Sequence, residues 1–201
     1  MQLVAPTTPD AHPSTRSTAL RSAGRWMLGF AGFPLGGFAS MLAIGPVDAA
    51  WKAVAGGLLT GAVVGGAQAL ALGRSGPDAP RWVAATAVGL AAGLGIGATA
   101  VGFATTLPAL VVQGAISGLA VGLAQAFLLW RRFGRRALVW PPLLALIWAA
   151  GWTVTTVSGV QVDDQFTVFG SFGAVTVTAL TLMLPFALAR TSARTTAGNA
   201  S

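Results

Sequence analysis

The sequence predicts an all-α, polytopic membrane protein with six transmembrane helices arranged as three helix hairpins. First, 54% of the 201 residues are hydrophobic and only 8% are charged, whereas about a quarter of a soluble domain is charged. Second, the chain holds six apolar runs, each long enough to cross a hydrocarbon core of about 30 Å. Third, nearly all the basic residues fall on one side of six such crossings, as the positive-inside rule requires.

The chain begins and ends with polar tails that flank a transmembrane domain over residues 25–190. Residues 1–24 are polar and proline-rich, so we expect a disordered cytoplasmic tail that cannot bury enough apolar surface to offset its ordering entropy. We expect the same of 191–201. Pro185 predicts a bend near the end of the last span. The six predicted spans are 26–45, 53–73, 82–104, 107–130, 137–157 and 166–189.

The basic residues predict how the chain is oriented. Eleven of the twelve Lys and Arg residues share one side of the six-span arrangement, and only Lys52 falls on the other. We therefore expect both termini in the cytoplasm. A signal peptide is the alternative for the first run, although twenty apolar residues are long for one. The densest basic cluster, which we expect against the inner leaflet, is Arg131, Arg132, Arg135 and Arg136.

Glycines recur at every fourth position in the second and fourth spans, in two copies fifty-seven residues apart. This spacing keeps the glycines on one helix face, where the lack of side chains lets another helix approach closely. A glutamine, Gln68 or Gln125, follows three positions after the last glycine of each seam. The seam residues are Gly57, Gly61, Gly65, Gly114, Gly118 and Gly122.

A tryptophan opens each odd-numbered span, and a glycine follows it eleven positions later. We interpret this as three parallel hairpins in a pseudo-threefold arrangement around an axis along the membrane normal. In the third copy, Leu180 stands in the glutamine position. We expect the tryptophans at the cytoplasmic interface, as in an aromatic belt. The three pairs are Trp26 and Gly37, Trp82 and Gly93, and Trp140 and Gly151.

One phrase recurs between about Gly56 and Gly151: G-x-x-x-G-x-x-Q, then an apolar stretch, an Arg, and a Trp-led helix with A-x-x-x-G spacing. In this it resembles a set of uncharacterised bacterial multi-pass membrane proteins. Ala69 and Ala126 stand where those proteins usually carry a Trp after the Gln. The resemblance implies a repeated-hairpin membrane fold and no known activity. We expect the chain to lie in the bacterial inner membrane.

The composition leaves little material for catalysis. The chain has no Cys and no Glu, and its single histidine, His12, lies in the N-terminal tail. We therefore expect no metal site, no cofactor and no catalytic residues. No ionisable side chain lies deep in a predicted span, which counts against proton-driven or sodium-driven transport. Because orientation explains the net charge of +7, we expect no nucleic-acid partner.

Gln68 and Gln125 are the most informative polar residues in the predicted spans. They either hydrogen-bond across helix contacts or face a cleft that binds a neutral polar ligand or a lipid headgroup. Thr60 and Ser117, on the next turn, could join either arrangement. We expect Gln113 at the outer interface. The threonines of the last two spans are expected to bond to carbonyls of their own helices or to mediate helix packing, rather than to line a pore: Thr153, Thr155, Thr156, Thr167, Thr176, Thr178 and Thr181.

These features favour a non-enzymatic membrane component, either an accessory or scaffold subunit or a binder of lipid or a small apolar molecule. The alternative is a facilitator or channel for a small uncharged solute, with Gln68 and Gln125 on the path. The lipid bilayer is the expected partner, and another membrane subunit or a second copy of the chain remains open. A hydrated passage that reaches both glutamines would favour the channel, whereas tight glycine contacts without a cavity would favour the scaffold.

Overall fold

The computed structural model describes residues 15–160 and 168–198, and within these ranges the chain is helical and has no strands. Five segments are long and apolar enough to cross a membrane, judged by length and composition. These segments suit a multi-pass membrane protein. They are Leu20–Ile44, Ala50–Ser75, Ala79–Ala100, Leu107–Val157 and Ser171–Thr191.

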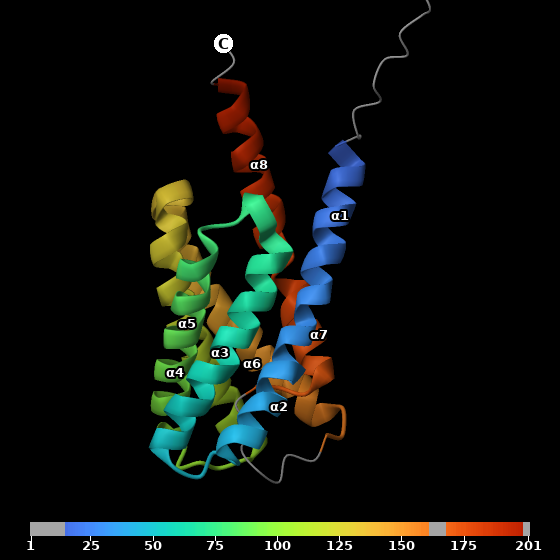
Figure 1. Cartoon of the computed structure of the whole chain (residues 1–201). Helices are drawn as coiled ribbons and strands as arrows, with labels where there is room; N and C mark the ends of the chain where they lie inside the picture. The colour runs from blue at the N-terminus through green and yellow to red at the C-terminus, as the bar shows by residue number, and fades with distance from the viewer. Residues whose placement is uncertain (1–14, 161–167, 199–201) are drawn as a thin grey trace, which may run out of the picture.

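The helices form a single bundle (Figure 1). Each packs on the next along the chain from α2 to α7, and α1 and α2 pack on α7, so the bundle closes into a ring. The helices are α1 (Thr15–Leu28), α2 (Gly32–Ile44), α3 (Ala50–Leu72), α4 (Ala79–Ala100), α5 (Leu107–Phe133), α6 (Trp140–Val157), α7 (Ser171–Leu180) and α8 (Met183–Gly198). Short 3-10 turns connect some of them: η1 (Gly29–Ala31), η2 (Gly73–Ser75) and η3 (Gly134–Val139).

Two of the membrane-length segments are interrupted four residues before a proline. A proline has no N–H for the carbonyl four residues earlier, and its ring crowds that carbonyl. Pro34 therefore breaks the helix at Phe30, within η1, and Pro185 breaks it at Thr181, between α7 and α8. At the second break the Leu184 N–H bonds to the Thr181 carbonyl at 3.0 Å. The bend expected from Pro185 is found as this break.

Helix extends into both tails for which the composition predicts disorder. Helix α1 begins at Thr15, and α8 continues to Gly198. The two helices pack on each other, and α1 also packs on α3. Such tertiary contacts stabilise helices whose intrinsic propensity is marginal. Residues 1–14 and 199–201 lie outside the described residues.

The charged residues separate to the two ends of the bundle. Figure 1 shows the start of α1, the end of α8 and the α3–α4 turn at the same end. At the opposite end, Lys52 forms a 2.7 Å salt bridge with Asp48 at the start of α3. Between the ends, large apolar side chains are exposed on the outer surface, among them Phe38, Leu58, Leu70, Phe127, Leu146 and Phe172. Helices α1 and α8, the α3–α4 and α5–α6 turns and the helix ends beside these turns carry Arg21, Arg25, Arg74, Arg81, Arg131, Arg132, Arg135, Arg136 and Arg190.

The glycines of α3 lie against the backbone of α4. A Cβ atom added at Gly57 would lie 2.7 Å from the Leu90 carbonyl oxygen, and one at Gly61 would lie 2.7 Å from the Ala87 Cα. Gly65 meets the same helix. Because packed atoms do not approach so closely, these positions have no room for a side chain.

The glycines of α5 lie in the same way against α6. An added Cβ would lie 3.0 Å from the Trp148 carbonyl oxygen at Gly114 and 2.6 Å from the Pro141 Cα at Gly122, and Gly118 lies between these contacts. Later residues of α5 thus meet earlier residues of α6. The two helices inside the segment Leu107–Val157 therefore run antiparallel.

The glycines that follow the tryptophans are not equivalent. Gly93 and Gly151 contact the next helices, α5 and α7, but Gly37 meets only a side chain that precedes α7. Its neighbour Gly36 makes the corresponding contact, because an added Cβ there would lie 3.0 Å from a backbone oxygen of α3. The 3-10 turn η1 winds about 20° further per residue than an α-helix. Over three residues this moves the contact face from the eleventh to the tenth position after Trp26.

Candidate functional site

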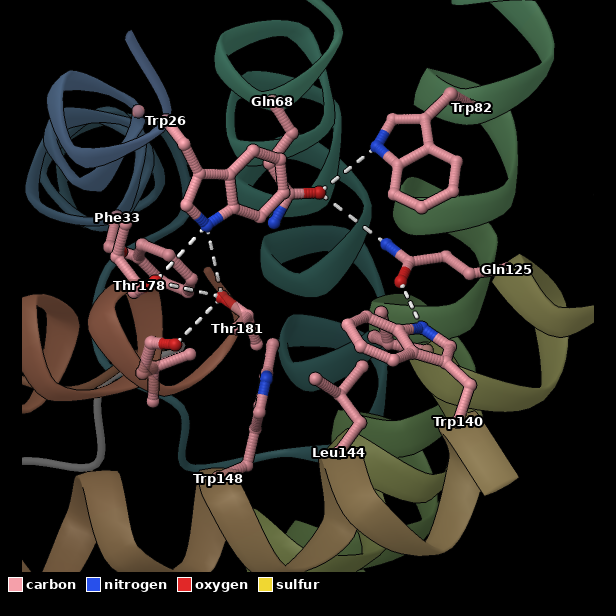
Figure 2. Close-up of a pocket in the computed structure, with 13 residues that line it drawn as sticks. Trp26, Phe33, Gln68, Trp82, Gln125, Trp140, Leu144, Trp148, Thr178 and Thr181 are labelled. Carbon is pink, nitrogen blue, oxygen red and sulfur yellow. Dashed lines mark hydrogen bonds between the residues drawn. The ribbon is translucent and has the colours of Figure 1, made fainter. Parts of the chain in front are cut away.

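Three tryptophans point into the bundle near its basic end (Figure 2). Trp26, Trp82 and Trp140 are only 3%, 1% and 7% exposed. The expectation of an interfacial aromatic belt is therefore wrong for them. A buried indole N–H needs an acceptor, and each of these three has one inside the bundle.

The two glutamines and two of the tryptophans form one hydrogen-bond network across four helices. Trp82 on α4 donates through Nε1 to Gln68 Oε1 on α3 at 3.0 Å. Trp140 on α6 donates to Gln125 Oε1 on α5 at 2.8 Å. The Gln125 amide Nε2 donates to Thr86 Oγ1 at 3.0 Å and reaches Gln68 Oε1 at 3.4 Å. The structure thus brings Gln68 and Gln125 together, as partners of each other and of the tryptophans.

The third tryptophan finds its acceptor at the end of the chain. Trp26 Nε1 donates to the Thr178 carbonyl at 3.0 Å and to Thr181 Oγ1 at 3.2 Å. The Thr181 hydroxyl in turn donates to the Val177 carbonyl at 2.8 Å. Sequence alignment of the copies points instead to Leu180, which is apolar and largely exposed. A threonine hydroxyl and a backbone carbonyl therefore take the place of the glutamine in this copy.

These residues surround a central cavity of only about 10 Å³ (Figure 2). Such a space holds about one water molecule. Beside it, the rings of Phe33, Trp148 and Phe169 pack on one another, with centroids 5.1 to 6.1 Å apart. At this level the interior of the bundle is filled by side chains.

Thr60 and Ser117 do not join the glutamine network. Thr60 is buried and donates its hydroxyl to the Gly36 carbonyl at 3.1 Å, which connects α3 to α2. Ser117 is also buried, and its hydroxyl has no partner within the described ranges. The residues that do bond to the glutamines are tryptophans and Thr86. The sequence carries a signal for them, because 14 or 15 residues separate each glutamine from its tryptophan.

Gln113 was expected at the outer interface, but it lies inside the bundle. Its side chain is 0% exposed, and neither its amide nitrogen nor its oxygen has a hydrogen-bond partner in the part of the chain that the structure describes. It sits one helical turn before Ser117, against Gly97 of α4. Ser40 on α2 is also buried, and its hydroxyl has no partner among the residues that the structure describes. The interior therefore contains polar groups whose bonding capacity is unused.

The threonines of α6 and α7 bond to their own helices, as predicted. Each hydroxyl donates to the carbonyl four residues earlier at 2.8 to 3.0 Å. These bonds occupy hydroxyls that would otherwise line a polar surface. The prediction is confirmed for Thr153, Thr155, Thr156, Thr176, Thr178 and Thr181, and Thr167 lies outside the described residues.

Two arginines at the basic end hold neighbouring elements together. Arg132 donates to the carbonyls of Ser75 and Gly76, which connects the end of α5 to η2. Arg25 donates to the Leu70 carbonyl at 2.8 Å, near the end of α3, where helix carbonyls lack partners and the helix dipole is negative. Arginines of this end therefore contribute to packing as well as to charge.

Comparisons with protein-family models, with curated proteins and with solved structures found no match to this chain. Among the described residues, no group of three or more His, Cys, Asp or Glu side chains could hold a metal ion. The chemistry of the site is that of neutral hydrogen-bonding groups, which can position helices or bind a neutral polar molecule.

Proposed function

We propose that this protein is a non-enzymatic component of the bacterial inner membrane that acts as an accessory or scaffold subunit, or as a binder of lipid or a small apolar molecule. The observation that carries this proposal is the filled interior. The polar side chains near its centre bond to one another, and the cavity among them has a volume of about 10 Å³. A protein whose centre is occupied in this way acts through its outer surface.

The proposal includes six crossings in three parallel hairpins. Three contacts of one kind support it: a tryptophan at the start of each hairpin bonds to a polar group on the second helix of the preceding hairpin. The third contact, from Trp26 to Thr178, joins the two ends of the chain and completes the cycle. The antiparallel packing of α5 and α6 supports two crossings within Leu107–Val157.

The basic end is proposed to face the cytoplasm, and this orientation can be tested by labelling. The chain has no cysteine, so single cysteines can be introduced without background. Ala79→Cys and Ser158→Cys place exposed thiols at opposite ends of the bundle. In intact cells, a membrane-impermeant maleimide should label Ser158→Cys, and Ala79→Cys should react only after lysis. Labelling of both variants, or of Ala79→Cys alone, in intact cells would overturn the proposed topology.

A flux assay distinguishes a scaffold from a facilitator with Gln68 and Gln125 on its path. Proteoliposomes that contain the wild type or the Gln68→Leu/Gln125→Leu variant are compared with empty vesicles for water, glycerol and urea flux by stopped-flow light scattering. We expect the wild type to equal the empty vesicles, because the centre has room for about one water. Flux in the wild type that is lost in the variant would establish the facilitator instead.

The resemblance to uncharacterised bacterial multi-pass proteins is part of the same proposal. The phrase that carries it contains Gln68, Trp82, Gln125 and Trp140, and these four side chains form one hydrogen-bond network. This supports a role for the phrase in closing the bundle. The hydrogen bonds among these four residues favour helix packing, and not catalysis, as the role of the phrase.

A further inference from the structure

An apolar groove of about 200 Å³ opens at the basic end, between the α5–α6 turn and α8. It is about twenty times larger than the central cavity. Among the described residues, Arg136 is the one charged residue that lines it, and Trp140 forms part of its wall. The apolar lining residues include Leu129, Phe133, Leu143, Met183, Leu184 and Ala187.

The charged side chains that line and flank this groove among the described residues are arginines. Arg136 and the neighbouring Arg131 and Arg135 are exposed on the turn and at its edge. In the described ranges the acidic residues are Asp48 and Asp78, which pair with Lys52 and Arg81, and neither of them lines the groove. A bound molecule would therefore contact an apolar groove that also contains the exposed guanidinium of Arg136.

We propose that this groove binds one acyl chain of an anionic phospholipid whose phosphate is bound by the Arg136 guanidinium. The inference rests on the proposed function, because it places the basic end at the cytoplasmic leaflet, where anionic headgroups lie. A guanidinium matches the geometry of a phosphate and bonds to it through two N–H groups. The apolar lining accepts a hydrocarbon chain but offers no partner to a polar one.

The groove also meets the central network. Trp140 lines both the groove and the central cavity, and its N–H is held by Gln125. A chain in the groove would therefore contact a tryptophan whose side chain is held in place by the network.

Native mass spectrometry of the purified protein with phosphatidylglycerol and phosphatidylcholine of identical chains tests this proposal. We expect the wild type to retain phosphatidylglycerol preferentially and Arg136→Gln to retain it about fivefold less, with little change for phosphatidylcholine. Arg131→Gln is the matched control, since it removes an exposed arginine that does not line the groove. Ala187→Trp fills the groove without changing charge and should weaken binding of both lipids.

Equal loss in Arg136→Gln and Arg131→Gln would show that the whole basic surface attracts lipid and would overturn the site. Unchanged binding in Ala187→Trp would overturn the acyl-chain assignment. Circular dichroism of each variant verifies that the fold is kept. Failure of these tests leaves the flux and labelling results intact, whereas solute flux would refute the proposed function whatever lipid is bound.

Discussion

Two buried glutamines on the same helix should respond in opposite ways to the same substitution. Gln125 accepts a 2.8 Å hydrogen bond from Trp140 Nε1 and donates to Thr86 Oγ1 at 3.0 Å. The Gln113 side chain makes no hydrogen bond within the described ranges, and the residue is fully buried. Methionine is close to glutamine in length and in helix propensity, so Gln→Met at each site isolates the hydrogen bonds.

The magnitude for Gln125→Met follows from the groups that it would leave without partners. Thr86 would keep its bond to the Trp82 carbonyl at 2.9 Å, and Gln68 would keep the donor from Trp82. Only the Trp140 N–H would be left buried and unpaired, which costs about 1–3 kcal/mol. Measured side-chain hydrogen bonds within membranes average about 0.6 kcal/mol, so we expect Gln125→Met to lose about 0.6–3 kcal/mol in the free energy of unfolding.

Gln113→Met should instead raise the free energy of unfolding. The substitution removes two unpaired polar atoms from an apolar interior, and we expect a gain of about 1 kcal/mol or more in the free energy of unfolding. The two variants should therefore differ by about 1.6 kcal/mol or more in the free energy of unfolding. Reversible unfolding in mixed micelles with increasing SDS, followed by circular dichroism, measures both against the wild type. If Gln125→Met proved as stable as Gln113→Met, the assignment of the network as a stabilising element would be refuted.

Two further predictions use matched pairs in the same unfolding assay. Gly61→Ala should destabilise the bundle by about 1–3 kcal/mol, because the added Cβ would overlap α4. At Gly66 an added Cβ would have no atom within 4 Å, so Gly66→Ala should be neutral or stabilising by up to about 1 kcal/mol. Equal effects would contradict the close approach of α3 and α4. Trp26→Phe should lower the free energy of unfolding by about 0.5–1.5 kcal/mol, because it removes the hydrogen bond to the Thr178 carbonyl. Trp51→Phe should lower it less, because Trp51 is exposed. A larger loss at Trp51 would argue against a bundle closed through Trp26.

Local features could be predicted where the physics is local. The threonine back-bonds and the break ahead of Pro185 depend on residues within one turn, so the sequence contains all that decides them. The expectation of disordered tails was wrong for the tail residues that the structure describes, because contacts between α1 and α8 stabilise helix there. Composition alone cannot report such contacts.

The partners of the polar groups could not be predicted. The acceptor for Trp26 lies 152 residues away, and in its copy the glutamine is missing. Gln113 and Gln125 occur on one helix with similar apolar flanks, yet one is bonded and the other is not. Which side chain meets which depends on the helices that lie opposite.

The sequence by itself determined that the chain is helical and that its helices are long and apolar enough to cross a membrane. In an apolar run of this length, a helix is the way in which one segment satisfies its own backbone groups. Only the tertiary structure decided that the ring closes through Trp26, that the tryptophans turn inward to the glutamines, and that almost no space remains between them. A side-chain hydrogen bond needs two groups within about 3 Å, and only the packing of the helices sets that distance.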